Sequence, residues 1–201
     1  MPKVTFFNLP EDKRQTLIQA VRQEFSRVPL NQASITNIIT AANIPRGSFY
    51  QYFEDKEDAF FFLLNELIKE DKENFISLLR QNDGDLFDTM CDFFRLILTK
   101  EDTHQFLKNI FLNMTHKIES AYARIFIDIE EDGSFKEAVS SFIDQSALNI
   151  SNDRELLYVM KIIIAVTLRN LIEKFARDLP YEEAMNHYLV EIDLLKRGLK
   201  Q

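Results

Sequence analysis

The chain has 201 residues, a formal net charge of −8 at neutral pH and a mean hydropathy of −0.20. This length permits one large domain or two small ones. Its longest apolar runs, 59–64 and 162–166, are far shorter than the roughly 18 residues of a membrane-spanning helix. We therefore expect no membrane span, and residues 1–7 lack the pattern of a signal peptide.

Apolar residues recur every three or four positions along most of the sequence, which is the spacing of helices with one buried face. Only 4 glycines and 5 prolines interrupt this pattern, and the alternation typical of strands is rare. The fold class is therefore predicted to be all-α.

The first strong helical pattern follows Asn8. Asn8 and Glu11 have the spacing of a capping box, and Pro10 is tolerated in a first helical turn. Before this helix, Phe6 and Phe7 are expected to cover apolar surface. Along the helix, one continuous apolar stripe needs a partner, and it consists of Leu17, Ile18, Val21, Phe25 and Val28.

Two short helices joined by a tight corner are predicted next. Ser34 is a good N-cap, because its hydroxyl can accept a hydrogen bond from an amide of the first turn. Asn43 ends this helix, since asparagine tolerates the left-handed conformation that is common just past a helix end. Pro45 suits the first turn of the second helix. The first helix carries apolar residues at helical spacing: Ile35, Ile38, Ile39 and Ala42.

The second short helix has an apolar and a polar side. Phe49 and Phe53, four residues apart, form the apolar side. The polar side carries Arg46, Gly47, Ser48, Tyr50 and Gln51. Arginine and glutamine can bind base edges, serine and tyrosine hydroxyls can bind phosphate oxygens, and glycine lets backbones approach closely. This composition suits the major groove of DNA.

Residues 47–57, Gly-Ser-Phe-Tyr-Gln-Tyr-Phe-Glu-Asp-Lys-Glu, resemble the recognition helix of the TetR family of bacterial helix-turn-helix transcription regulators. That family typically has Gly-Ser/Thr-aromatic-Tyr-x-His/Tyr-Phe followed by x-x-Lys-Glu. The chain departs from the family at Asn43, where Gly is usual, and at Pro45, where Ser is usual. The second change removes a hydroxyl and an amide that could hold a phosphate.

The resemblance implies an N-terminal three-helix helix-turn-helix domain, residues 1–55, and a larger C-terminal helical domain for effector binding and dimerisation, residues 56–201. It also implies the following DNA-binding residues: Ser34 and Thr36 near a phosphate, Arg46, Ser48 and Gln51 facing the groove, Tyr50 and Lys56 on the DNA backbone, with Gly47 and Tyr52 beside them. Three alternatives stay open. Arg46 and Lys56 can be ordinary solvated charges, Tyr52 can support the helix by packing, and DNA shape can be read in place of a base contact by Gln51.

An acidic chain is unexpected for a DNA-binding protein, so the distribution of its charge matters. Up to Lys56 the chain has seven cations and five anions, a net +2, and the remainder carries −10. The overall charge therefore says little about a small DNA-reading domain. The modest +2 predicts few phosphate contacts per subunit and an affinity that depends on dimerisation.

A long helix is predicted after Lys56, with Asp55 as its cap and Leu79 near its end. It would connect the DNA-reading domain to the rest of the chain. Residues 82–85, Asn-Asp-Gly-Asp, end it. Further helices are expected over about 86–98, 103–116, 118–129 and 135–142, with turns at 132–134 and 149–153.

The last two predicted helices are the strongest. Residues 156–175 are apolar almost all round, which implies a second buried face, and another apolar seam follows Leu179-Pro180. Two such helices from each of two subunits would form a four-helix interface, as the resemblance implies, so we expect a homodimer. The expected interface residues are Leu157, Ile164, Leu168, Leu171, Met185, Tyr188, Ile192 and Leu195.

Large apolar side chains are also frequent over 86–142. Packing is the ordinary explanation, but the resemblance implies an effector cavity. Its ligand would be a small, mostly apolar or aromatic molecule, because few charges fall on these faces. A protein effector is the alternative. The candidate pocket residues are Phe94, Phe106, Phe111, Met114, Tyr122 and Phe126.

Catalysis and metal binding find no support in the sequence. There is no Gly-x-Ser-x-Gly elbow, Gly-rich phosphate loop, Cys-x-x-Cys, His-Glu-x-x-His or pair of Glu-x-x-His motifs. His104 and His116 are twelve residues apart, three helical turns, so they cannot share a metal. The single Cys91 fits a reducing compartment. We expect a cytoplasmic regulator without cofactor, a repressor by analogy, that leaves a palindromic double-stranded DNA operator when an effector binds.

Overall fold

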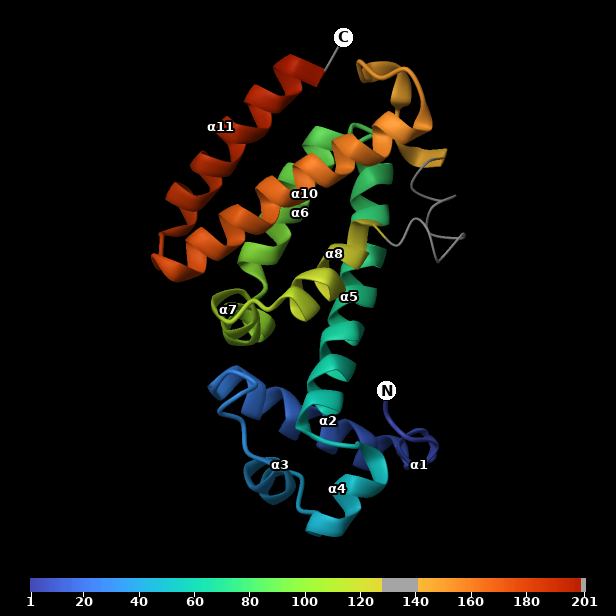
Figure 1. Ribbon diagram of the computed structural model, residues 1–201, viewed down its shortest axis with the longest axis vertical. Coiled ribbons are helices and arrows are strands. Elements are labelled where there is room, and N and C mark those ends of the chain that lie inside the picture. The colour runs from blue at the N-terminus through green and yellow to red at the C-terminus, as the bar shows by residue number, and fades with distance from the viewer. Residues whose placement is uncertain (128–140, 200–201) are drawn as a thin grey trace. The chain divides into compact units, whose positions relative to one another are not determined.

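The computed structural model describes residues 1–127 and 141–199, with the backbone alone for residues 122–127, 153 and 199. Every regular element in these ranges is a helix, which confirms the all-α fold class (Figure 1). The turn expected at 132–134 and most of the helix expected over 135–142 lie outside the described residues. No helix in the described part is long and apolar enough to cross a membrane.

The chain divides into two compact units. One, which we call the head, contains Met1–Leu67 and Glu101–Thr115, and the other, the body, contains residues 68–100 and the chain from His116 onward. The head therefore extends beyond the DNA-binding domain expected over residues 1–55. The second expected domain, 56–201, is shared between the two units.

The head is built from α1 (Val4–Phe7), α2 (Glu11–Arg27), α3 (Ile35–Ala41), α4 (Arg46–Tyr52), the first part of α5 (Lys56–Gln81), η1 (Glu101–Thr103) and α7 (His104–Leu112). Helix α2 packs against α3 and α7, and α4 packs against α1 and α3. Aromatic rings join α2, α5 and α7: Phe60 lies edge-on to both Phe25 and Phe106, with ring centroids 5.2 and 5.7 Å apart. The stripe expected on α2 thus finds its partners in the head core.

Some helix ends in the head agree with the sequence and others do not. Asn43 has a φ of 52°, which confirms the left-handed residue after α3. Asp55 accepts a hydrogen bond from the amide of Asp58 at 2.8 Å, which confirms the cap of α5. The capping box of Asn8 and Glu11 is wrong, because Asn8 ends α1 and Pro10 precedes α2.

The body is built from the rest of α5 with α6 (Leu86–Thr99), α8 (His116–Ile127), η2 (Gln145–Ala147), α10 (Asp153–Ala176) and α11 (Tyr181–Leu199). Helices α10 and α11 lie side by side, and α6 packs against α11 (Figure 1). The break expected after α5 is confirmed at Asp83 and Gly84, whose φ values are 50° and 84°. A Cβ at Gly84 would lie 2.3 Å from the carbonyl oxygen of Phe142, so only glycine fits there.

Two buried polar pairs interrupt the apolar packing of the body. Tyr188 and Thr167 share a hydrogen bond of 2.8 Å between their hydroxyl oxygens. Asp71 on α5 is buried and accepts a hydrogen bond from Lys100, which also lies 3.1 Å from Glu70. Burial outweighs the attraction of Lys100 and raises the pKa of Asp71. Burial also raises the pKa of the Cys91 thiol to about 11.

Candidate nucleic-acid interface

Helix α4 presents a polar surface because Phe49 within it and Phe53 directly after it are buried. Phe49 and Phe53 lie fully inside the head, with ring centroids 5.5 Å apart. Pro45 precedes the helix with a φ of −60° and a ψ of 148°. The residues expected to contact DNA follow the opposite side: Arg46, Gly47, Tyr50 and Gln51 are exposed, and Ser48 and Tyr52 are half-buried.

Gly47 lies on the exposed side of α4. A Cβ built there would meet no described heavy atom within 4 Å, so packing inside the chain does not explain the glycine. The backbone of α4 is open to close approach from outside at this position.

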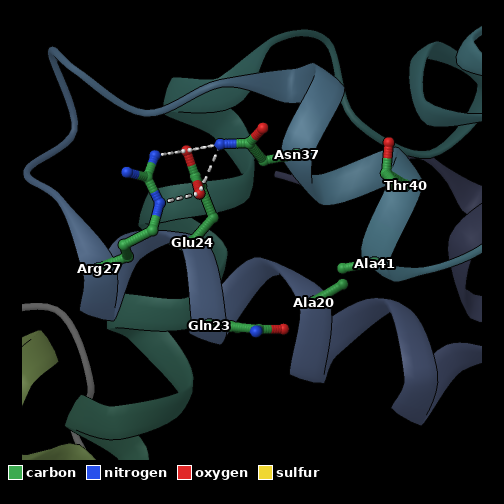
Figure 2. A pocket seen from close by; sticks show the side chains of 7 residues that line it. All are labelled: Ala20, Gln23, Glu24, Arg27, Asn37, Thr40 and Ala41. Carbon is green, nitrogen blue, oxygen red and sulfur yellow. Dashed lines mark hydrogen bonds and ion pairs between the residues drawn. The ribbon is translucent and has the colours of Figure 1, made fainter.

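The start of α3 is held by a carboxylate from α2. Glu24 is only 4% exposed, and its Oε1 accepts a hydrogen bond from the Ser34 amide at 2.7 Å. The same carboxylate accepts two hydrogen bonds from Arg27, at 2.8 and 2.9 Å, and others from the Asn37 side chain at 3.2 Å. Figure 2 shows Glu24 between these two side chains. Glu24 therefore ties the end of α2 to the first turn of α3.

The electrostatics of this cluster favour an ionised Glu24. Burial alone would raise its pKa, but the hydrogen bonds from Arg27, the Ser34 amide and Asn37 outweigh burial and lower it. The cluster borders a surface hollow of about 330 Å³ between α2 and α3, lined by Ala20, Gln23, Glu24, Arg27, Asn37, Thr40 and Ala41 (Figure 2). Glu24 thus fixes the first turn of α3 to α2 at one side of this hollow.

Ser34 occupies the N-cap position of α3, as the sequence predicts, and its carbonyl accepts a hydrogen bond from the backbone amide of Asn37 at 3.1 Å. The expected capping bond to its hydroxyl is not formed in the described structure. Thr36 is exposed one residue into the helix, whereas Ser34 is half-buried. Thr36 is therefore the more accessible of the two residues expected near a phosphate.

Lys56 has partners inside the head. Its ammonium donates to the carbonyls of Asn31 and Ala33, each at 3.0 Å. These carbonyls belong to the loop between α2 and α3. Lys56 therefore holds this loop, which sequence reasoning did not anticipate, and its expected contact with the DNA backbone stays a prediction.

Helix α7 holds the end of α2 in a similar way. The side chain of Asn109 donates to the carbonyls of Phe25 and Ser26, each at 2.9 Å. These carbonyls lie in the last turn of α2, where a helix lacks its own donors. Helix α7 lies in the head segment Glu101–Thr115, and the chain before this segment, residues 68–100, and after it, from His116 onward, belongs to the body.

Comparison with known protein families identifies both parts of the chain. Residues 17–61 match the family described as "Bacterial regulatory proteins, tetR family". Residues 85–199 match the "Tetracyclin repressor-like, C-terminal domain", which alone covers more than half of the chain. The chain belongs to the TetR family. The resemblance stated for residues 47–57 is confirmed, and the chain contains the two domains of a TetR-family transcriptional regulator.

Solved structures of TetR-family regulators resemble this chain over nearly its whole length. A TetR family transcriptional regulator from Chloroflexus aurantiacus J-10-FL is 26% identical, with a TM-score of 0.51, over 100% of this chain and 99% of that one. SmeT, the repressor of the Stenotrophomonas maltophilia multidrug efflux pump SmeDEF, is 16% identical, with a TM-score of 0.70, over 94% and 90%. No curated protein sequence matches significantly.

NalD, the secondary repressor of the MexAB-OprM multidrug efflux pump in Pseudomonas aeruginosa, is 19% identical, with a TM-score of 0.62, over 95% of this chain and 98% of that one. At such identities, SmeT and NalD share the TetR fold with this chain. They do not establish a shared ligand or operator.

The residues expected to line a TetR effector pocket are divided between the two units. Phe94 is fully buried in the body and stacks on Tyr188, with ring centroids 4.0 Å apart. Phe106 and Phe111 are buried in the head, and Met114 is half-buried there. The side chains of Tyr122 and Phe126 lie outside the described residues. Phe94, Phe106 and Phe111 are thus packed within their own units, and their role in an effector pocket stays a prediction.

Most residues expected at the TetR dimer interface are buried within the subunit: Ile164, Leu168, Leu171, Met185, Tyr188 and Ile192. Leu157 and Leu195 are half-buried. The apolar side chains that α10 and α11 leave exposed are others, namely Tyr158, Ile162, Leu189, Val190 and Leu194. Spacing alone could not separate these two sets, because both faces of α10 are apolar.

Metal ligands do not gather in the described structure. Among residues 1–127 and 141–199, no group of three or more His, Cys, Asp or Glu side chains could hold a metal ion.

Proposed function

We propose that this TetR-family chain is a homodimeric repressor that binds a palindromic DNA operator and leaves it when a small effector binds. The observation that carries this proposal is α4, whose buried phenylalanines leave Arg46, Gly47, Tyr50 and Gln51 exposed together. These groups suit base edges and phosphates. Residues 1–55 would form the DNA-binding domain proper, and binding to bacterial DNA would place the protein in the cytoplasm.

The two recognition helices of the dimer would enter successive major grooves about 34 Å apart. Arg46, Ser48 and Gln51 would face the bases, with Gly47 allowing close approach. The phosphate contacts would come from Ser34, Thr36, Tyr50, Tyr52 and Lys56. With few such contacts per head, both heads are needed for useful affinity.

The dimer contact would be made by the exposed face of α10 and α11. Tyr158 and Ile162, 51% and 45% exposed, lie four residues apart on α10, and Val190 and Leu194, 52% and 56% exposed, lie four apart on α11. Residues four apart share one helix face. A four-helix interface would cover these side chains.

Effector control would pass through α5 and α7. Helix α5 runs from the head into the body. Helix α7 holds α2 through Asn109 and lies in the head segment Glu101–Thr115, which the chain enters from the body and leaves for the body. An effector can shift the equilibrium only by its differential affinity for the two states. A small, mostly apolar molecule is proposed, and a protein effector is the second candidate.

The test is selection of bound sequences from random duplex DNA by the purified protein at controlled salt. The wild type is expected to select a palindrome, and an Arg46→Ala/Tyr50→Ala variant is expected to lose it. Arg154→Ala, which removes an exposed cation from the body, is the control and should keep it. No enrichment by a folded wild-type dimer would contradict the proposal.

A further inference from the structure

The carbonyl end of α4 needs four partners. In an α-helix the last four carbonyls have no amide donor in a following turn. In α4 they belong to Phe49, Tyr50, Gln51 and Tyr52. The first accepts a hydrogen bond from the Phe53 amide at 2.9 Å, where the helix ends. The other three belong to residues proposed to contact DNA.

These three carbonyls all accept hydrogen bonds from the N-terminal segment. The Lys3 ammonium donates to the carbonyl of Tyr50 at 2.8 Å, and the Lys3 amide donates to the carbonyl of Tyr52, also at 2.8 Å. The Thr5 hydroxyl donates to the carbonyl of Gln51. Residues 3 and 5 therefore complete the hydrogen bonding of the recognition helix.

Phe6 fixes the same segment to the head core. It is 1% exposed, and its ring centroid lies 5.2 Å from that of Phe53 and 4.9 Å from that of Phe62. Phe53 directly follows α4, and Phe62 belongs to α5. One buried ring and three hydrogen bonds thus act on a single end of one helix.

Helix α4 is short enough to need support from outside the helix. It has seven residues, and isolated helices shorter than about 12–15 residues are marginal in water. The Lys3 ammonium also lies at the carbonyl end of α4, where a helix carries partial negative charge. The segment supplies from outside what a helix of this length cannot supply itself.

We propose that residues 3–6 form a clamp that positions α4 for reading DNA, with Lys3 and Thr5 as positioning residues. The clamp holds the backbone from which Tyr50 and Gln51 project. This inference rests on the proposed function of α4 as the recognition helix. Sequence discrimination then depends on two side chains that need not touch a base.

The test uses the full chain without an N-terminal tag and compares two matched pairs of variants. Thr5→Val removes the donor while keeping size and charge, and Thr5→Ser restores the hydroxyl. Lys3→Met removes the ammonium, and Lys3→Arg restores a donor. In free protein, amide hydrogen exchange of residues 50–53 should accelerate roughly fivefold to tenfold in Thr5→Val and in Lys3→Met, while α2 is unchanged. Thr5→Ser and Lys3→Arg should exchange as the wild type does.

DNA binding supplies the second readout. For Thr5→Val, affinity for the selected operator should fall roughly fivefold to tenfold and affinity for an unrelated duplex less than twofold. The salt dependence should stay unchanged, because no charge is lost. A purely structural loss of folded protein would lower both affinities together and would not change their ratio.

Two results would overturn the clamp: unchanged exchange of residues 50–53 in Thr5→Val, or an unchanged ratio of operator to unrelated affinity. Failure of the proposed function looks different. In that case the wild type selects no operator, while the exchange measurement still decides whether residues 3–6 hold α4.

Discussion

The head and the body are held together in different ways. In the head, α3 and α4 have seven residues each, whereas α10 and α11 in the body have 24 and 19. Short helices are marginal alone, so the head binds their ends with polar groups from distant parts of the chain. These groups are Glu24 on the Ser34 amide, Lys56 on the loop before α3, Asn109 on the end of α2, and Lys3 and Thr5 on α4.

The body combines local caps and apolar packing with polar contacts between distant residues, such as that of Lys196 with Asp88 at 2.8 Å. Asp85 caps its own helix α6 through the amides of Phe87 and Asp88, at 2.9 and 3.0 Å, and Asn152 caps α10. Its core is aromatic, with Phe94 stacked on Tyr188. The difference indicates that single polar changes will disturb the short helices of the head, while the largest losses of stability in the body will come from changes in packing.

The largest effect is expected in the body. Phe94→Ala should lower the free energy of unfolding by about 3–5 kcal/mol, because it leaves a cavity beside Tyr188 in a fully buried site. Denaturant unfolding, with Phe94→Leu as the smaller change, measures it. A loss in the free energy of unfolding below about 1 kcal/mol would contradict the packing role and favour a position of Phe94 in the wall of an effector cavity.

The strongest polar effect is expected in the head. Glu24→Ala should cost about 2–3 kcal/mol of stability, because the Ser34 amide and Asn37 side chain lose a charged acceptor. Arg27→Ala should cost less, since the Arg27 side chain is 53% exposed. Thermal and denaturant unfolding compare the two variants. Equal losses would show that the ion pair, rather than the hold on α3, stabilises this corner.

Substitution of Lys56 distinguishes a DNA contact from a purely structural role. If Lys56 also meets a phosphate, Lys56→Met should weaken operator and unrelated DNA by the same factor, roughly threefold to tenfold, and lower the salt slope by about 0.9. Titrations at several salt concentrations measure this slope. An unchanged slope would restrict Lys56 to its bonds with Asn31 and Ala33.

The smallest expected effect is on the pH dependence of stability, to which Glu24 in the head and Asp71 in the body should contribute with opposite signs. Because the pKa of Glu24 is lowered in the folded state, its ionisation stabilises the fold at pH values above the ordinary glutamate pKa of about 4.3. This stabilisation is lost as the pH falls through the folded-state pKa. The raised pKa of Asp71 has the reverse effect, since the folded state binds that proton more tightly than the unfolded state.

Unfolding from pH 7 to pH 3 therefore distinguishes the two carboxyl groups. As the pH falls, the wild type should lose stability relative to Glu24→Gln and gain stability relative to Asp71→Asn. A shift of the same sign in both comparisons would contradict the assigned directions.

Features that depend on neighbouring residues could be predicted from the sequence. The all-α class, the left-handed Asn43 and the Asp55 cap follow from local spacing and backbone preference, and all three are confirmed. The recognition-helix pattern is local too, and the TetR family assignment from residues 47–57 is confirmed.

Features that depend on distant residues could not be predicted. Ser34 has the right chemistry for a cap, but Glu24, ten residues earlier, binds its amide. Lys56 resembles a free cation in sequence, although its partners lie 23 and 25 residues away. The apolar residues of α10 are equally ambiguous, because only their tertiary neighbours decide which face is buried.

The central claim is that exposed side chains of α4 read DNA bases, and Gln51 tests it most directly. Selection from random duplex DNA should be carried out in parallel with the wild type and Gln51→Ala. The account predicts that both select palindromes that differ at one matching position in each half-site. An identical selected site would contradict base reading by Gln51 and assign specificity to DNA shape.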